Sequence, residues 1–295
     1  MDKVVVTGGA GFIGSHLVDA LVADGYEVHI IDDLSAGKKE NVNQNAILHI
    51  KDIRNADALG PIFSGAQYVF HLAALPRVQY SIEHPRHTND VNLSGTLNVL
   101  TAAKEAGVKR VLFAASSAAY GDQKTSPHRE DMLPEPKSPY GLQKLMGEQY
   151  CAFFSKHYGL PTVSLRFFNV YGTRMSSDGA YVLVLANFLK LRKQGKPLTI
   201  TGDGGQVRDF VHVSDVIRAL LLAAQSERVG QGEVINIGIG KNCSIAHLAK
   251  VIGGPVVYVP ARYEPRETLA DISKAKELLG WESRVSIEEG LKELL

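Results

Sequence analysis

A glycine-rich turn near the start of the chain, TGGAGFIG at residues 7–14, restricts the fold more than any other feature. It follows three valines at 4–6, a run typical of a buried strand, and it opens a segment with helical spacing over 15–24. Glycine is needed where the backbone reverses, where amides approach a phosphate and where the helix packs on the sheet. The spacing predicts a dinucleotide-binding turn formed by Gly8, Gly11, Phe12, Ile13 and Gly14.

The first half of the chain alternates β-rich runs with helical segments. Strands are predicted at 28–31, 68–70, 110–113 and 162–167, and helices at 15–24 and 93–106. Such alternation predicts an α/β fold with a doubly wound parallel sheet of the Rossmann type. Beyond Gly172, proline and glycine interrupt a less regular pattern, which predicts a smaller α/β C-terminal lobe.

Two acidic residues, Asp32 and Asp33, end the second predicted strand about twenty residues after the turn. A carboxylate at this place binds the adenosine ribose and repels a 2′-phosphate, so the predicted cofactor is NAD rather than NADP. The alternative is that both residues only begin a solvated turn. The residues predicted to line the same site are Leu34, Ser35, Ala36 and Gly37.

Residues 138–144 predict the start of a helix, with Ser138 as its N-cap and Pro139 as its first residue. Tyr140 and Lys144 then share one helix face. A nearby ammonium, the helix N-terminus and an oxidised nicotinamide would each favour phenolate. We therefore predict a lowered pKa for Tyr140 and a role as general base. The alternative is an ordinary pair of side chains on a surface helix.

Hydroxyl groups follow the fourth predicted strand, which runs into AASSAAYG at 114–121. Because ligands bind at the carboxyl ends of parallel strands, Ser116 and Ser117 are predicted to face the substrate. Ser116 would hydrogen-bond the reacting oxygen and share its proton with Tyr140. The alternative is that both serines only cap the strand end.

Composition narrows the class of protein. The formal net charge of the 295 residues is +1, which gives no electrostatic footprint for nucleic acid or an anionic membrane. No window of about eighteen apolar residues is present, and the charged opening at 1–3 does not lead into a signal peptide. Cys151 and Cys243 are too few for a disulfide framework or a zinc cluster. We expect a cytoplasmic protein without a metal site, a nucleic-acid partner or a membrane partner.

Together these motifs resemble the extended short-chain dehydrogenases, specifically the UDP-sugar 4-epimerases, over essentially the whole chain. The resemblance implies NAD-dependent inversion of the 4-hydroxyl of a UDP-hexose through a 4-keto intermediate, with Ser116, Tyr140 and Lys144 as catalytic residues. It also implies a homodimer formed through two long helices of each subunit. The motifs that carry it are TGGAGFIG at 7–14, HLAA at 71–74, SSAAYG at 116–121, YGLQK at 140–144, RFFNVYG at 166–172, GDGGQVRDFVHVSD at 202–215 and LADISKAKELLGW at 269–281.

The same resemblance assigns binding residues by position. It places Asp52 and Ile53 at the adenine, and at the nicotinamide it places Leu72, Ala73, Ala74, Asn92 and Phe168. For the substrate it assigns Asn169 to a phosphate or sugar oxygen, Arg208 and Arg262 to the diphosphate, and Leu183, Val184, Thr199 and Thr201 to the uracil and ribose. It implies an NAD-binding domain over 1–168, to which 209–238 returns, and a nucleotide-sugar lobe over 169–208 and 239–295. The alternative for Arg208 is a structural ion pair with Asp203 or Asp209.

Four features bear on the substrate and the reaction. The family's position three residues before Asp271 is small where an N-acetyl group is admitted, and Thr268 there predicts UDP-GlcNAc and UDP-GalNAc as substrates beside UDP-Glc and UDP-Gal. The short SSxxYG turn resembles the N-acetylhexosamine-acting branch, whereas the segment after Arg262 is one residue short. Related dehydratases carry Asp-Glu after the catalytic serine or threonine, where this chain has Ser117 and Ala118. The competing interpretations are a nucleotide-sugar decarboxylase or dehydratase, and an NAD-sensing protein without activity.

Overall fold

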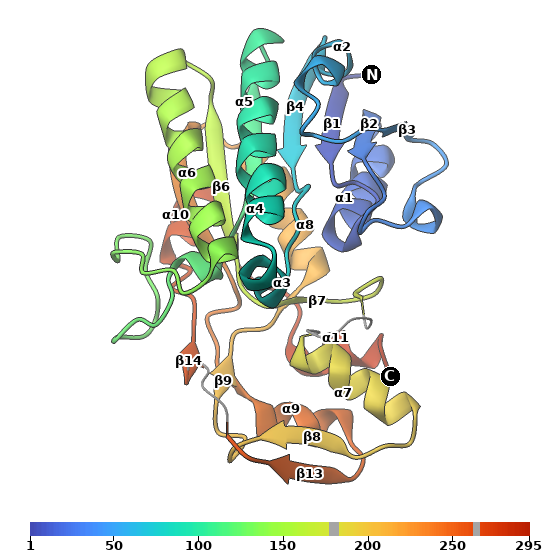
Figure 1. Cartoon of the computed structure of the whole chain (residues 1–295), viewed down its shortest axis with the longest axis vertical. Helices are drawn as coiled ribbons and strands as arrows, with labels where there is room; N and C mark the ends of the chain where they lie inside the picture. The colour runs from blue at the N-terminus through green and yellow to red at the C-terminus, as the bar shows by residue number, and fades with distance from the viewer. Residues whose placement is uncertain (177–182, 262–265) are drawn as a thin grey trace.

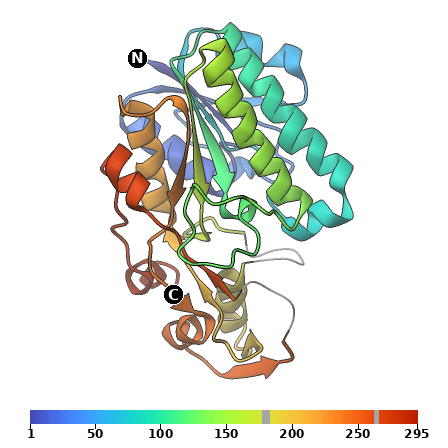
Figure 2. The ribbon, with the colours of Figure 1, turned by 90° about the vertical axis from the view of Figure 1, so that its left-hand side faces the viewer.

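In the computed structural model of the chain, residues 1–176, 183–261 and 266–295 are described. A large part is built on a sheet flanked by helices, and a smaller lobe lies beyond the carboxyl ends of the strands (Figures 1 and 2). No helix in the described ranges has the length and apolar character needed to cross a membrane.

The large sheet has seven strands in the order β11-β6-β5-β4-β1-β2-β3, and all neighbours run parallel. The order reverses beside β1, so this is the doubly wound sheet that the sequence predicts, with its switch point between β1 and β4. The strands are β1 (Lys3–Thr7), β2 (Glu27–Asp32), β3 (Ile47–Ile50), β4 (Ala66–His71), β5 (Arg110–Ser116), β6 (Thr162–Phe167) and β11 (Gln231–Ile237).

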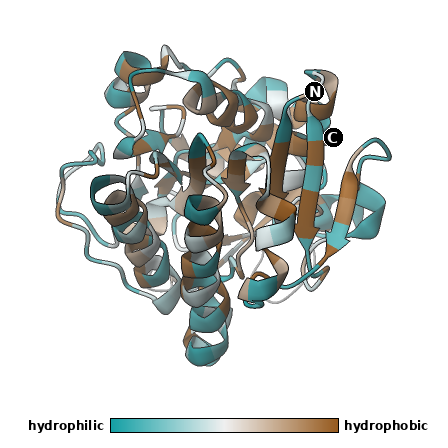
Figure 3. Cartoon of the chain, turned by 90° about the horizontal axis from the view of Figure 1, so that it is seen from above, coloured by the Kyte–Doolittle hydropathy of each residue, from teal (hydrophilic) through white to brown (hydrophobic). Residues whose placement is uncertain are grey.

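Helices cover both faces of the sheet with apolar side chains, and the strands are largely apolar between them (Figure 3). Val4 and Val6 face one layer and Val5 the other, and all three are fully buried. One layer holds α1 (Phe12–Ala23), α8 (Val213–Gln225) and α10 (Ser273–Leu279). The other holds α2 (Gly60–Phe63), α5 (Gly95–Glu105) and α6 (Pro139–Tyr158).

The helix predicted over 93–106 is α5, which is preceded by a π-helical turn, η3 (Asp90–Ser94). Two short helices, α3 (Val78–Glu83) and α4 (Pro85–Asn89), lead into it and pack on α6. Short 3-10 turns are η1 (Lys39–Asn41), η2 (Ala56–Ala58) and η4 (Ser117–Ala119).

The smaller lobe has a core of its own beneath the sheet. Its helices are α7 (Val184–Lys193), α9 (Ile245–Ile252) and α11 (Ile287–Lys292). Two parallel strands pair in it, β8 (Leu198–Thr201) and β13 (Val256–Val259). A three-stranded group is formed by β12 (Cys243–Ser244), β9 (Val207–Arg208) and β14 (Glu267–Thr268), and β7 (Val170–Tyr171) pairs with β10 (Val211–His212).

The chain passes between the two parts several times. β11 and α8, within the predicted return at 209–238, lie in the sheet and on its face. α10 and Trp281 also pack on the sheet, although the predicted boundaries assign 239–295 to the lobe. Asp209 connects the parts because its carboxylate accepts hydrogen bonds from the amides of Ile239, Gly240 and Ala270 at 2.7, 3.0 and 3.1 Å.

Candidate active site

The glycine turn is too tight for side chains at two positions. Gly8 has a φ of +74°, and a Cβ there would lie 2.7 Å from the Ala73 amide nitrogen. A Cβ on Gly14 would overlap the carbonyl oxygen of Gly8. No side chain caps α1, whose N-cap is Gly11, so the first amides of the helix remain available as donors for an anion.

Asp32 is tied to the glycine turn. Its carboxylate accepts hydrogen bonds from the amides of Ala10 and Leu34, both at 2.9 Å. Burial raises the pKa of Asp32, and these two hydrogen bonds oppose the rise. Asp33 is exposed and accepts from the Ser35 amide at 2.9 Å. The alternative, that these acids only begin a solvated turn, therefore fits Asp33. It does not fit Asp32, which is buried beside the glycine turn.

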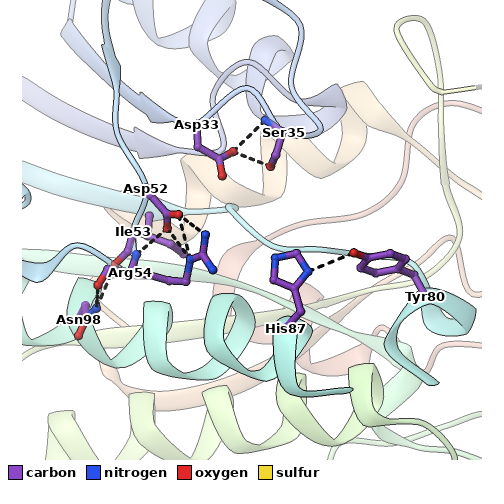
Figure 4. A network of polar contacts seen from close by, with 8 residues as sticks. All are labelled: Asp33, Ser35, Asp52, Ile53, Arg54, Tyr80, His87 and Asn98. Carbon is purple, nitrogen blue, oxygen red and sulfur yellow. Dashed lines mark hydrogen bonds and ion pairs between the residues drawn. The ribbon is translucent and has the colours of Figure 1, made fainter. Parts of the chain in front are cut away.

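A polar group at the predicted adenine side joins segments distant in the sequence (Figure 4). Arg54 Nε donates to Asp52 Oδ1 and Oδ2 at 3.0 and 2.9 Å, which lowers the pKa of that carboxyl. Asn98 Nδ2 holds the Ile53 carbonyl oxygen at 3.1 Å. Arg54 and His87 project into the space between the Asp33 loop and α4. The sequence motifs did not single out Arg54 or His87.

A buried histidine braces the loop predicted at the nicotinamide. His71 lies with Nδ1 2.7 Å from Thr7 Oγ1 and Nε2 2.8 Å from Thr96 Oγ1. Thr7 Oγ1 also accepts from the Ala73 amide at 3.2 Å, so β1, β4 and α5 all hold this loop. Burial lowers the pKa of His71 to about 3, so the imidazole is neutral. The HLAA motif at 71–74 includes His71 but does not indicate that this residue braces the loop.

Asn92 fixes the same loop against α6. Its Oδ1 accepts from the Leu75 amide at 2.7 Å, and its Nδ2 donates to Gln143 Oε1 at 2.8 Å. The amide of Asn92 is therefore engaged within the chain, which makes the residue a brace of the loop after β4. Its direct contact with a cofactor stays a prediction.

The structure brings Ser116, Tyr140 and Lys144 together at the carboxyl end of β5. Ser138 caps α6 as predicted, accepting from the Gly141 amide at 3.1 Å. The Ser116 hydroxyl is close enough to the Tyr140 phenol to lower the pKa of that phenol. Lys144 Nζ lies 6.0 Å from the centre of the Tyr140 ring and donates to the Ala114 carbonyl oxygen at 2.7 Å.

The predicted lowering of the Tyr140 pKa is wrong for the chain by itself. Tyr140 lies where α3 packs on α6, with its amide donating to Ser81 Oγ at 3.0 Å, and burial raises its pKa above the ordinary value. The hydrogen bond from Ser116 opposes that rise. Burial also lowers the pKa of Lys144 to about 8. Without a further positive charge, Tyr140 is thus a neutral phenol near pH 7.

The turn after Ser116 carries no acid. Ser117 and Ala118 lie in η4, and the Ala118 amide donates to Ser116 Oγ at 3.2 Å. The Ser116 side chain therefore caps this turn, as the alternative interpretation expects, and it also acts on the pKa of Tyr140. The position of a dehydratase-type acid is filled by a hydroxyl and a methyl group.

The residues predicted to bind substrate lie on the lobe and at its junction with the sheet. Asn169 Nδ2 donates to the Asp209 carbonyl oxygen at 2.9 Å, and Phe168 is buried against Tyr120. Arg208 lies on β9 directly opposite Thr268 of β14. The others are Leu183 before α7, Val184 at its start, and Thr199 and Thr201 on β8; Arg262 lies outside the described residues.

The acids proposed as alternative partners of Arg208 have other contacts. Asp203 pairs with Arg266, Oδ2 to Nη2, at 3.2 Å. Asp209 accepts three backbone amides.

The dinucleotide-type turn after β1, the buried Asp32 at the end of β2 and the Ser116–Tyr140–Lys144 group at the end of β5 all lie at the carboxyl edge of the same parallel sheet. The family model described as NAD dependent epimerase/dehydratase family matches residues 4–238. The chain belongs to this family.

Several similar proteins align with nearly the whole length of this chain. A putative UDP-glucose 4-epimerase of Methanocaldococcus jannaschii is 38% identical over 99% of this chain and 97% of its own. A UDP-glucose 4-epimerase of Thermotoga maritima, solved with UDP-glucose, is 42% identical with a TM-score of 0.93 over 99% and 97% of the two chains. A UDP-N-acetylglucosamine 4-epimerase of Methanobrevibacter ruminantium, solved with UDP-N-acetylmuramic acid, has a TM-score of 0.95 and 38% identity over 99% and 96%.

Decarboxylases are also among the relatives. A UDP-glucuronic acid decarboxylase 1 of Xenopus tropicalis is 34% identical over 99% of this chain and 71% of its own. Overall similarity therefore supports an NAD-dependent enzyme of the UDP-sugar class, and the reaction has to be argued from the site.

Proposed function

We propose that this chain catalyses NAD-dependent 4-epimerisation of a UDP-hexose. The observation that carries the proposal is the Ser116–Tyr140–Lys144 group at the end of β5, on the same edge of the sheet as the dinucleotide turn, with no carboxylate in the turn after Ser116. This set can remove and return the proton of a hydroxyl, but it lacks the dehydratase acid.

The residues at this edge of the sheet fit NAD. The spaces at Gly8 and Gly14 that a Cβ would fill, and the uncapped start of α1, suit a pyrophosphate. Asp32 offers a carboxylate whose oxygens retain lone pairs for ribose hydroxyls. When bound, NAD supplies a hydride acceptor that can return what it receives.

The chain's own residues would handle the proton. Tyr140 as phenolate takes the proton of the 4-hydroxyl, and Ser116 hydrogen-bonds the same oxygen. Lys144 as ammonium stabilises the phenolate and holds the cofactor ribose. After the 4-keto sugar presents its other face, Tyr140 returns the proton. Arg208 and Arg262 would hold the diphosphate so that the sugar turns without leaving.

We propose UDP-Glc and UDP-Gal as substrates, with UDP-GlcNAc and UDP-GalNAc admitted through the small side chain of Thr268. Thr268 lies opposite Arg208 in the β9–β14 pair. A sugar substituent held close to Arg208 would therefore contact the Thr268 side chain. The names of the similar enzymes, which include epimerases of both sugar types, support this range.

A decarboxylase is the second candidate, because such an enzyme is 34% identical to the chain. The two functions differ in what they release. A decarboxylase acting on a UDP-hexuronate liberates carbon dioxide, whereas an epimerase only interconverts two sugars.

Proton NMR of the purified protein tests both. It would be incubated separately with UDP-glucose, UDP-GlcNAc and UDP-glucuronic acid, without added reductant. The galacto anomeric signal from either neutral sugar establishes 4-epimerisation. If only UDP-glucuronic acid reacts and it gives a pentose signal, the reaction is decarboxylation and the proposed 4-epimerisation is wrong. No change with any sugar, despite bound NAD, favours the sensing interpretation.

We also propose a homodimer. Leu142, Met146 and Phe153 lie on one outer face of α6 and are 50%, 40% and 46% exposed. Three large apolar side chains on one face of a long helix suit an interface with a second copy.

A further inference from the structure

A buried ion pair lies one helical turn beyond Lys144. Arg166 Nε and Nη2 donate to the two carboxylate oxygens of Glu148 at 2.8 and 2.7 Å. The side chains are 3% and 0% exposed. Glu148 follows Lys144 by four residues on α6, so both lie on one helix face. Two parallel hydrogen bonds hold both side chains of this pair in fixed orientations.

The pair also touches the serine turn. The Arg166 guanidinium carbon lies 4.4 Å from the centre of the Tyr120 ring. Tyr120 directly follows η4 and is fully buried, and its hydroxyl donates to Asn236 Oδ1 at 2.7 Å. Arg166 thus holds Glu148 on one side and packs against the turn that carries Ser116 on the other.

Charged and titratable groups reach Lys144 from several elements. Glu148, Cys151 and Tyr140 share its helix, His71 comes from β4 and Arg166 from β6. Burial lowers the pKa of Lys144 to about 8, and Glu148 and Cys151 oppose this. Burial raises the pKa of the Cys151 thiol to about 12 and lowers that of His71 to about 3, so both are neutral at pH 7.

Glu148 is thus the negative charge that acts on Lys144 among these described groups. Burial raises the pKa of Glu148, and the Arg166 guanidinium opposes the rise and favours the carboxylate. A bidentate pair with a permanently charged guanidinium fixes the orientation of that carboxylate as well.

We propose that Glu148 is a positioning residue that acts through Lys144: held by Arg166, it keeps the lysine in its ammonium form. Its effect on catalysis rests on the proposed function, whereas the protonation of Lys144 can be measured without any substrate. Glu148 touches no reacting atom in this proposal.

An NMR titration of protein carrying ¹³Cε-lysine tests it. The Lys144 signal is identified by its loss in Lys144→Met. In Glu148→Gln the titration midpoint should fall by about one pH unit or more, because an opposite charge has been removed. The double variant Glu148→Gln/Arg166→Gln removes the guanidinium that the single change leaves unpaired. The Lys144 midpoint in the double variant should still lie below the wild-type midpoint. The double variant is the test used if Glu148→Gln does not fold.

Ser155→Ala is the matched control, since Ser155 is a buried residue of α6 that bonds Thr162 and no charged group. It should lower the melting temperature without moving the Lys144 midpoint. A wild-type midpoint in the double variant overturns the proposal. In an active enzyme, the alkaline limb of the kcat/KM profile should move to lower pH in Glu148→Gln; an unmoved limb also overturns it. An inactive protein whose Lys144 midpoint still falls supports the role of Glu148 and contradicts only the proposed epimerisation.

Discussion

The carboxylate of Asp32, at the end of β2, accepts a hydrogen bond from the Ala10 amide in the glycine turn at 2.9 Å. One side chain therefore shapes the turn and faces the proposed ribose site. Replacing Asp32 with Ala should remove the ribose acceptor and leave two amides without their partner. We expect NAD affinity to fall by roughly 5- to 150-fold, or about 1–3 kcal/mol.

Calorimetric titration of NAD into stripped protein measures this effect. Asp24→Asn is the control, because Asp24 is an exposed acid at the end of α1. An unchanged dissociation constant in Asp32→Ala would show that the ribose is held elsewhere.

Tyr140 should be required for turnover but not for cofactor binding. Tyr140→Phe removes the hydroxyl that takes the proton and leaves the ring packed on α6. We expect kcat to fall by roughly 10²- to 10⁴-fold with bound NAD unchanged. The same assay on Tyr150→Phe, on the same helix, should give wild-type turnover. Full activity of Tyr140→Phe would move the general base to another residue.

The pKa shifts predict proton release when NAD binds. Burial raises the pKa of Tyr140 and lowers that of Lys144 to about 8. A positive nicotinamide ring favours the phenolate of Tyr140, so the Tyr140 pKa falls on binding and a proton leaves, whereas the new phenolate favours the ammonium form of Lys144. Calorimetry at pH 8 in buffers of different ionisation enthalpy should therefore show net release. Tyr140→Phe should release fewer protons, and equal release from both proteins would contradict the assignment to Tyr140.

The sequence predicted the parts of the site that depend on local geometry. The turn at Gly8 and Gly14 excludes side chains, and Ser138 starts α6 through a contact three residues away. Every strand–turn–helix unit of this kind needs the same residues at the same spacing, so a sequence motif can reveal them. The parallel order of the sheet followed from the alternation of strands and helices for the same reason.

Contacts between distant segments were not predictable in this way. His71 and Arg166 fall within motifs, but those motifs do not indicate which residues they contact, and their partners Thr7 and Glu148 stand 64 and 18 positions away. For the chain without cofactor, the direction of the Tyr140 pKa shift was wrong because burial, which depends on packing between distant segments, raises it. Asn92 matched a binding motif, yet its amide bonds within the chain.

The outer face of α6 should hold two copies together. Met146→Glu and Phe153→Glu would each place a charge among apolar side chains of the proposed interface. We expect light scattering after gel filtration to show a dimer for the wild type and a monomer for the double variant. Leu133→Glu, on a loop and 77% exposed, should leave the mass unchanged. A monomeric wild-type protein would contradict the proposal.

Thr268 should set the size of the sugar that is accepted. Its half-buried side chain lies on β14 opposite Arg208, and its carbonyl oxygen accepts the Asp209 amide at 3.0 Å, so its backbone is fixed. A tyrosine there would fill the space beside the proposed diphosphate clamp. Turnover of UDP-GlcNAc should fall by roughly 10- to 200-fold, whereas UDP-glucose turnover should stay within about threefold. Thr268→Ser, which keeps the space open, should retain both activities in the same NMR assay. A Thr268→Tyr enzyme with full N-acetylhexosamine activity would show that this position does not limit the pocket.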